Sequence, residues 1–488
     1  MGLLSPRSCL LWSIALTSHL ILPSSSLALP DTALQPLAPP QFPLENENLT
    51  LSPVAQLYHQ YGFLPPPSID PWYSPPTGWE STAPGTPLRI RQPAYPTINT
   101  KNCLDTLQIL YRSSDTHGQP SWAVTTIFRP LSFNSTSGSN STALRKYAGV
   151  VSYLVPSDSV ALDAAPSYLL QEKEPYGEMR DLLARGWIVA VPDYEGPRAS
   201  YCAGAQAGYA TLDSVRAMIE SADKYMGIDS ETARFAIWGY SGGAFAAAFA
   251  MELMEEYAGD LKERVVGAAV GGPALNLTTV AMAMNGKGTA GLVVASLLGV
   301  TGQWSEANAW LRSRLKTEGE RNATGFLAAE KMSGVGALMS YLGQNVYDYF
   351  IGGEEDVWHP IVQAVVDKDA VMGVRGTPPG KVPVFVYKAA QDEMSSVEET
   401  DELVGKYCAK GARVLYHRNH IGMHNDELWS GRLRTMDFLR KVLDDWKGTN
   451  ITVPEEGKCL TEDVHVPLDV KCLLPDWWFG QTPRTGCD

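Results

Sequence analysis

Short apolar runs alternate with longer segments of helical spacing over most of the chain. The runs that predict buried strands cover 148–155, 187–192, 234–238, 265–270, 382–388 and 413–416. Helices are predicted between and after them, at 179–183, 208–226, 244–251, 399–409 and 428–446. Because parallel strands need a crossover connection, this alternation predicts an α/β protein with a mostly parallel central sheet and helices on both faces.

The pattern differs at two places. Residues 107–113 and 122–128 have strand character, and the turn residues at 115–118 between them predict a β-hairpin. After Pro273 the alternation stops, and residues 276–375 contain helical stretches without a strand pattern. We interpret this segment as a helical cap or lid insertion over the catalytic face, because active-site loops leave from the ends of core strands in open α/β sheets. The alternative is a separate all-helical domain.

The segments before and after this pattern complete the predicted organisation. Proline pairs before residue 77 oppose regular helix or ladder pairing, but the aromatic residues Trp72, Tyr73 and Trp79 favour a partly ordered arm over a propeptide. The predicted parts are a signal peptide at 1–28, a Pro-rich N-terminal arm at 29–100, a core at 101–273, the cap at 274–375, the second part of the core at 376–447, and a cysteine-containing C-terminal tail at 448–488, which we expect to be held down.

The first residues predict secretion. Arg7 gives a basic start, an apolar stretch runs from Cys9 to Leu22, and Ala28 ends a small-residue cleavage site. The stretch is shorter than the roughly 20 residues that span a bilayer, so we expect a secreted, extracellular chain without a stable membrane anchor.

Cysteines and glycosylation motifs agree with an oxidising compartment. Without Cys9, an even set of cysteines remains, for which we expect three disulfides of unknown pairing. These cysteines are Cys103, Cys202, Cys408, Cys459, Cys472 and Cys487. The Asn-x-Ser/Thr motifs that predict a glycosylated surface are at Asn48, Asn134, Asn140, Asn276, Asn322 and Asn450.

Composition and charge narrow the choice of partners. The chain is 44% hydrophobic and 19% charged, which is typical of a globular protein and excludes a disordered one. Its net charge is −14 and it has no basic block, which argues against nucleic acid or an anionic membrane as a partner. We expect a monomer.

The pentapeptide at 239–243 has the pattern G-x-S-x-G, between a predicted strand and a helix rich in small residues. A sharp turn at this point would expose Ser241 Oγ and aim the backbone N–H of Gly242 at an oxyanion. A chance match is the alternative in a chain with 43 glycines, but the strand before it and the helix after it are the context that the motif requires. We therefore predict Ser241 as the nucleophile of an acyl-transfer reaction.

A serine nucleophile needs a general base and a carboxylate that orients the base, in the chain order serine, acid, histidine for this motif. Asp392 directly follows a predicted core strand and is the expected acid, with the adjacent Glu393 as the alternative. The base is expected in the loop after the strand at 413–416. Of its histidines we favour His424, which lies late in the loop, over His420 and His417.

A second oxyanion donor is expected from a loop earlier in the sheet. The backbone N–H of Asp193, in the turn after the strand at 187–192, is one candidate. Alternatively, Asp193 and Glu195 only cap or brace that turn, and the spacing does not decide between these roles.

The segments 110–118, 192–196, 239–244 and 383–387, with Asp392-Glu393 and the His424 loop, resemble the fungal secretory lipase family. The D-x-E-G turn followed by the pentapeptide is the more specific part of the resemblance, which extends from about residue 107 to about residue 446. It implies an α/β-hydrolase fold with a helical cap before the acid-bearing strand, a triad of Ser241, Asp392 and His424, and oxyanion donors at Asp193 and Gly242. The chain departs from the family at 394–396, where Met-Ser-Ser replaces a common Val-Pro, and in its cysteine-bearing tail.

The predicted activity is ester hydrolysis through an acyl-enzyme on Ser241, with no metal or cofactor. We expect a triacylglycerol lipase acting on a fatty-acyl ester at a lipid–water interface. Two alternatives stay open: a narrower esterase or acyltransferase for a soluble secondary metabolite, and a secreted binding protein that kept the fold without its catalysis.

Overall fold

The structure is a computed structural model that describes residues 51–60, 64–93, 102–135, 144–170, 176–449 and 451–468, without the side chains of His59, Asn134 and Ser135. Every described residue belongs to one compact unit, Leu44–Asp488. Several predictions therefore fall outside the described residues: the signal peptide, the Asn134 side chain, Asn48, Asn140, Asn450, Cys472 and Cys487.

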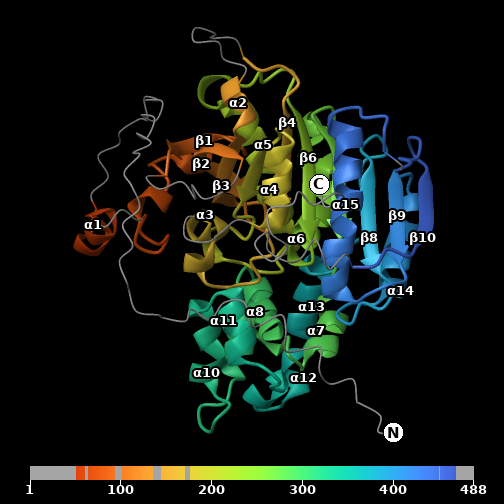
Figure 1. The fold of residues 1–488 in the computed structure, drawn as a ribbon. Helices are drawn as coiled ribbons and strands as arrows, with labels where there is room; N and C mark the ends of the chain where they lie inside the picture. The colour runs from red at the N-terminus through yellow and green to blue at the C-terminus, as the bar shows by residue number, and fades with distance from the viewer. Residues whose placement is uncertain are drawn as a thin grey trace, which may run out of the picture. The chain divides into compact units, whose positions relative to one another are not determined.

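The described residues form a ten-stranded sheet in the order β1-β2-β3-β5-β4-β6-β7-β8-β9-β10 (Figure 1). The strands are β1 (Pro87–Arg91), β2 (Cys103–Ser114), β3 (Pro120–Pro130), β4 (Gly149–Leu154), β5 (Ile188–Pro192), β6 (Arg234–Tyr240), β7 (Val265–Gly271), β8 (Val384–Ala389), β9 (Val414–Asn419) and β10 (Cys459–Val464). Neighbours from β5 onward in this order pair in parallel, and β1, β2, β3 and β5 pair antiparallel. The mostly parallel sheet and the hairpin, β2–β3, are as predicted.

Helices cover both faces of the sheet, as expected. The α-helices of the described residues are α1 (Pro53–Gln60), α2 (Ser132–Ser135), α3 (Pro166–Leu169), α4 (Gly177–Ala184), α5 (Gly204–Ser221), α6 (Gly242–Tyr257), α7 (Leu277–Met284), α8 (Ala290–Thr301), α9 (Ser305–Ser313), α10 (Ala323–Leu327), α11 (Gly334–Ser340), α12 (Glu354–Val357), α13 (Pro360–Asp369), α14 (Val397–Ala409) and α15 (His424–Leu443). Because successive strand side chains point to opposite faces, Phe235 and Ile237 of β6 belong to the core on the face with α5, α6 and α14, while Ala236 and Trp238 belong to the core on the face with α4 and α15.

The segment between β7 and β8 is helical. Residues 274–383, all of them described, form α7 to α13 with short 3₁₀ turns and connecting loops, and their only β contacts are isolated bridges. These helices pack on an apolar core of their own, which includes Leu297, Phe326 and Phe350. Most of them gather beyond one end of the sheet in Figure 1. Gly334 of α11 lies against the loop after β4, since a Cβ there would meet Ser157 O at 2.7 Å.

The N-terminal arm is more regular than predicted. Pro87–Arg91 forms β1 and pairs with β2, and Trp72 and Tyr73 pack in a small core with Leu110 and Val124. The proline pairs lie before β1, and Pro87 is its first residue, where no ladder N–H is needed, so proline does not prevent this pairing.

The sequence pattern predicts no strand after 413–416, but β9 is followed by a further strand, β10. β10 pairs in parallel with β9, and a disulfide joins its Cys459 to Cys408 of α14. The sequence pattern did not predict β10, because its residues alternate between half-buried and exposed positions and include polar side chains. An edge strand does not need the continuous apolar run of a central strand. Cys103 and Cys202 have no disulfide partner among the described residues, so three bridges stay a prediction.

The described glycosylation motifs begin helices. The Oδ1 of Asn276 accepts the N–H of Thr278 at the start of α7, and that of Asn322 accepts the N–H of Gly325 at the start of α10. Both residues are half-buried, and their modification stays a prediction. None of the helices in the described part of the chain combines the length and apolar character that crossing a bilayer requires.

Candidate active site

Ser241 lies on a strained turn between β6 and α6. Its backbone has φ 53° and ψ −117°, a combination that costs a non-glycine residue conformational energy. The flanking glycines allow the turn: a Cβ on Gly239 would lie 2.1 Å from Gly243 O, and one on Gly243 would lie 1.9 Å from Leu154 O. Strand and helix therefore pass at a distance that only glycine permits, and the half-buried Ser241 side chain stands at their junction.

His424 meets Ser241 across 183 positions of sequence. Its Nε2 lies 2.9 Å from Ser241 Oγ, and its Nδ1 lies 2.7 Å from Asp392 Oδ2. His424 is the first residue of α15, which begins four residues earlier than the predicted helix. The helix start holds the ring in place, because the backbone carbonyl of His424 accepts the hydroxyl of Tyr240. The structure thus brings the three sequence-predicted residues into one hydrogen-bonded chain.

The Asp392 side chain is completely buried and fully hydrogen-bonded. Its Oδ1 accepts the N–H groups of Met394 and Ser395 at 2.9 and 3.1 Å, so the segment that departs from the family pattern holds the carboxylate. Its Oδ2 faces both His424 and Lys388. Burial raises the pKa of Asp392, but the hydrogen bond and charge of His424 and the charge of Lys388 outweigh it and hold the pKa well below its usual range.

The alternative acid and bases have other partners. Glu393 Oε2 accepts the backbone N–H of His424 at 2.9 Å and so caps α15. His417 lies within β9, not after it as expected, and its Nε2 faces Glu462 of β10 at 2.8 Å. His420 faces Asp463 on the same strand. β10, which the sequence pattern did not predict, engages both histidines.

The structure corrects the prediction that the Asp193 N–H is an oxyanion donor. That N–H donates to Val124 O at 2.8 Å, and the carboxylate accepts the N–H and hydroxyl of Ser167. Asp193 follows β5, which β4 separates from the serine-bearing β6. Burial raises the pKa of Asp193 to about 7. With its N–H used in the ladder, Asp193 has no backbone donor to offer.

Asp158, which sequence reasoning missed, lies where a donor is needed. It follows β4, the strand beside β6, and its Oδ1 is so close to Gly242 that a Cβ there would lie 2.4 Å from it. This oxygen is buried and has no hydrogen-bond partner in the described part of the chain. Burial raises the pKa of Asp158 to about 6, against the opposing effects of the Tyr201 hydroxyl and the His424 charge. The sequence did contain a signal for Asp158. It lies in the loop after the predicted strand at 148–155, the third along the predicted core, and the G-x-S-x-G motif takes its second oxyanion donor from such a loop.

The D-x-E-G turn supports the loop that carries Asp158. The hydroxyl of Tyr194 donates to Val155 O at 2.8 Å. Burial raises the pKa of Glu195 well above its usual value. The turn is thus hydrogen-bonded to the segment that leads to Asp158.

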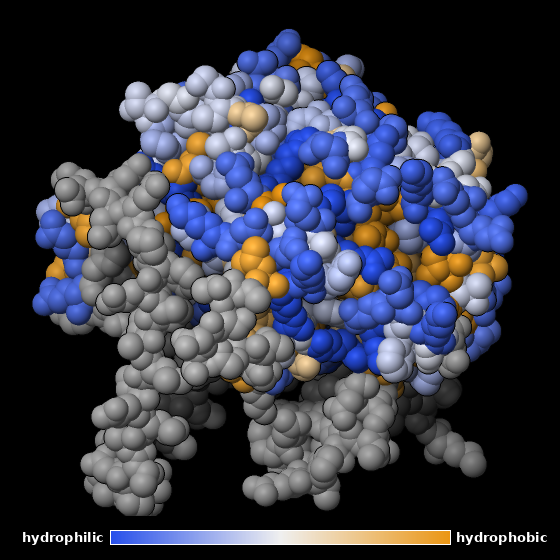
Figure 2. All heavy atoms as spheres, turned by 90° about the horizontal axis from the view of Figure 1, so that it is seen from above, coloured by the Kyte–Doolittle hydropathy of each residue, from blue (hydrophilic) through white to orange (hydrophobic). Residues whose placement is uncertain are grey.

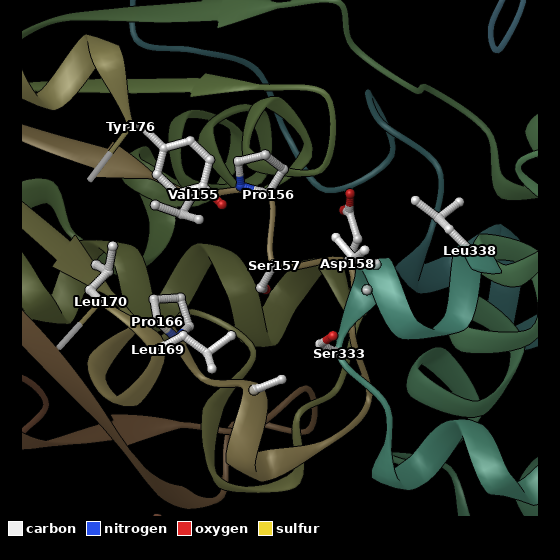
Figure 3. Close-up of a pocket in the computed structure, with 13 residues that line it drawn as sticks. Val155, Pro156, Ser157, Asp158, Pro166, Leu169, Leu170, Tyr176, Ser333 and Leu338 are labelled. Atoms are coloured by element: carbon white, nitrogen blue, oxygen red, sulfur yellow. The ribbon is translucent and has the colours of Figure 1, made fainter. Parts of the chain in front are cut away.

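A pocket of about 200 Å³ opens beside Asp158 (Figure 3). On one side lie Tyr176, Leu169 and Leu170, and on the other Ser333 and Leu338, contributed by α11 and the residue before it. The pocket therefore lies between the loop after β4 and the helical insertion.

Taken together, the site has the parts of an acyl-transfer centre. The Gly242 N–H belongs to the first residue of α6 and has no acceptor within the helix, so it is free to donate to an oxyanion. A serine hydroxyl in contact with an imidazole, itself in contact with a buried carboxylate, can attack a carbonyl carbon.

Comparison with known proteins gives a consistent picture. The family model described as secretory lipase matches residues 177–450. A trichothecene C-3 esterase of Fusarium sporotrichioides is 40% identical over 82% of this chain and 88% of its own length. Lipase A of Arthroderma benhamiae is 35% identical over 83% of this chain and 84% of its own. Among solved structures, Candida antarctica lipase A in its closed state superimposes with a TM-score of 0.68 at 24% identity, over 82% of this chain and 90% of the other. The chain therefore has the α/β-hydrolase fold and belongs to the secretory lipase family.

Proposed function

We propose that this protein is a carboxylic ester hydrolase that works through an acyl-enzyme on Ser241. The observation that carries the proposal is the continuous contact from Ser241 Oγ through the His424 ring to Asp392, on a turn whose serine has a strained backbone. Relatives named as esterases and lipases support it, since they cover most of the chain.

The steps follow from the contacts. His424 Nε2 takes the proton of Ser241 Oγ as that oxygen attacks the ester carbonyl, and Asp392 orients the ring and stabilises its charge. The Gly242 N–H and the carboxyl group of Asp158, in its protonated form, are the proposed donors to the oxyanion. The alcohol leaves with the proton from His424. Water then enters, is deprotonated by the same ring, and releases the acid.

For the substrate we propose an ester with a short acyl group on a compact alcohol. The pocket beside Asp158 measures about 200 Å³, below the roughly 300–1,000 Å³ of most pockets for drug-sized ligands. A short acyl group fits such a volume. The names of two relatives, a trichothecene C-3 esterase and a probable trichothecene esterase, favour an esterase over a triacylglycerol lipase.

A triacylglycerol lipase is the second candidate function. It is favoured by an exposed apolar surface at the pocket mouth, where Val335, Met339 and Leu342 of α11 and the following turn are 62%, 52% and 53% exposed. Such a surface suits contact with a lipid–water interface. The view in Figure 2, from the sheet end away from the insertion, shows a mostly hydrophilic surface with scattered apolar patches.

The test begins with the nucleophile. We expect purified protein to hydrolyse p-nitrophenyl acetate and Ser241→Ala to lose this activity, and mass spectrometry after a serine-directed phosphonate to find the adduct on Ser241. Equal hydrolysis by both proteins, or none by either, would instead favour a binding protein without catalysis. Rates on an acetylated polycyclic alcohol and on emulsified triolein then decide between the two substrate classes.

We also propose that the mature chain acts outside the cell, because the matching family is described as secretory. Intact mass and peptide mapping of protein from the culture medium test this. The same data report the new N-terminus and the occupancy of Asn276 and Asn322.

A further inference from the structure

Lys388 is a completely buried lysine that touches the acid of the proposed triad. It lies on β8, four residues before Asp392, and its side chain has no exposed surface. Its Nζ lies 2.8 Å from Asp392 Oδ2 and donates to Pro273 O at 3.0 Å. Burying an ammonium group is costly unless it is paired and hydrogen-bonded, so a lysine in this position requires an explanation.

The same carboxylate oxygen receives both Lys388 and His424. Asp392 Oδ2 lies 2.8 Å from Lys388 Nζ and 2.7 Å from His424 Nδ1, while Oδ1 accepts two backbone N–H groups. Four donors thus surround the carboxylate, and rotation of the group would break contacts at both oxygens. Its orientation toward the imidazole is therefore determined by Lys388 together with the loop after β8.

Lys388 also changes the charge of the site. With both neighbours ionised, the buried ammonium and the carboxylate form a neutral pair, whereas Asp392 alone would leave one uncompensated negative charge. An adjacent positive charge favours the ionised carboxylate and disfavours a further proton on the Asp392–His424 pair. Burial lowers the pKa of Lys388, and the adjacent Asp392 carboxylate opposes this by favouring the ammonium form, which donates to both Asp392 Oδ2 and Pro273 O.

We propose that Lys388 is a positioning residue for this reaction, which holds Asp392 on His424 and keeps the Asp392–His424 pair from taking up a proton in mildly acidic solution. The inference rests on the proposed function, because it assigns Lys388 a role in the same ester hydrolysis. Its contact with Pro273 O, at the end of the sheet segment where the helical insertion begins, ties the acid loop to that insertion.

Other titratable groups also face this cluster, and they come from every surrounding element. They are Asp158 after β4, Tyr240 of β6, Glu393 after β8, Glu399 of α14 and Glu427 of α15. Most of them are acids, which favour protonation of the pair. Arg434 pairs with Glu427, and Lys388 opposes the acids by its contact with Asp392 itself. Removal of Lys388 should therefore have a visible effect.

The experiment measures kcat and KM for p-nitrophenyl acetate from pH 4 to 9. The proteins are wild type, Lys388→Met, Lys388→Gln and the control Lys381→Met, whose lysine precedes the same strand and is 62% exposed. For Lys388→Met we expect kcat to fall roughly tenfold or more with little change in KM, as for a misplaced catalytic group. We expect the acidic limb of its pH–rate profile to move to higher pH by about one unit. The reason is that a neighbouring opposite charge shifts the pKa of a carboxyl group by roughly 1 to 3 units.

Lys388→Gln keeps hydrogen-bond donors at this position but removes the positive charge. We therefore expect the same shift of the acidic limb as in Lys388→Met, with a smaller loss of kcat. Lys381→Met should behave like the wild type. An acidic limb that coincides with that of the wild type in both Lys388 variants would overturn the proposal while leaving the proposed function intact. That function is tested separately by loss of activity in Ser241→Ala.

Thermal unfolding gives a second readout that does not depend on activity. Asp392→Asn leaves the ammonium unpaired and should lower Tm, and adding Lys388→Met to that variant should restore part of the loss. Purely additive losses of Tm would contradict the buried ion pair on which the proposal rests.

Discussion

At the scale of single residues, position relative to the serine decides which acid lies close to Gly242 and is a candidate oxyanion donor. Asp158 and Asp193 both follow buried strands, and burial raises the pKa of both. Asp193 uses its backbone N–H in the ladder and its carboxylate on Ser167, whereas the buried Oδ1 of Asp158 has no partner among the described residues. The two aspartates differ in what they contact, not in type.

We predict that Asp158→Ala lowers kcat by about 10²–10³-fold, the range for loss of one oxyanion donor. Asp158→Asn should retain more activity, because its neutral amide can donate without having to hold a proton. Steady-state kinetics on p-nitrophenyl acetate measure both. Asp163→Ala, at an exposed aspartate nearby, is the control, and equal losses in Ala and Asn variants would contradict a donor role.

At the scale of elements, α11 connects the pocket to the surface. Val335 and Leu338 line the pocket, and Met339 and Leu342, at the end of α11 and just after it, expose their side chains. We predict that Met339→Ser combined with Leu342→Ser slows hydrolysis of emulsified triolein at least severalfold, because less apolar surface reaches the lipid, and leaves soluble p-nitrophenyl acetate unchanged. Leu433→Ser, at an exposed leucine of α15, serves as the control. Unchanged triolein hydrolysis in the double variant would remove the support for the lipase candidate.

The disulfide between α14 and β10 holds the final strand on the sheet. It closes a loop between residues 51 positions apart. We predict that Cys459→Ser lowers the free energy of unfolding by about 2–4 kcal/mol, because the cross-link restricts the unfolded chain. Urea unfolding with and without reductant measures the effect. Reductant should destabilise the wild type more than the variant, because the variant already lacks this bridge. Equal effects of reductant on the two proteins would contradict the prediction.

At the scale of the whole molecule, buried carboxylic acids make the fold less stable at high pH. Burial raises the pKa of Asp213 to about 6 and that of Glu252 to about 7, as it does for Asp158 and Asp193. In such groups the native state binds more protons than the unfolded state, so stability is complete below the ordinary carboxyl range and declines as the pH rises toward these values. The fold should therefore unfold at a lower temperature at pH 8 than at pH 5.

Glu252 offers the sharpest test of this pH dependence. Its carboxylate accepts the Tyr407 hydroxyl and the N–H groups of Gly373 and Arg375 in the core. A pKa raised to about 7 corresponds to on the order of 3 kcal/mol lost on ionisation, so Glu252→Gln should flatten the fall of Tm between pH 5 and 8. Glu255→Gln, at an exposed position of the same helix, should not. Parallel Tm curves for Glu252→Gln and the wild type would refute this assignment.

What the sequence alone determined is local. The turn at Ser241 follows from an apolar run, spaced glycines and a run of small residues, because adjacent residues set the strand, the turn and the helix. The helices of the insertion and the strands β4 to β9 follow from periodicity in the same way. Asp392 was predictable because it directly follows an apolar run.

What only the tertiary structure decided is the set of neighbours. The strand order places β4 beside β6, so Asp158 rather than Asp193 adjoins Gly242, and β10 beside β9, where Glu462 and Asp463 engage His417 and His420. Lys388 appears in sequence as one polar residue at the end of a strand, and only packing buries it on Asp392. Pairing between distant segments depends on the summed contacts of the whole core, which local patterns do not contain.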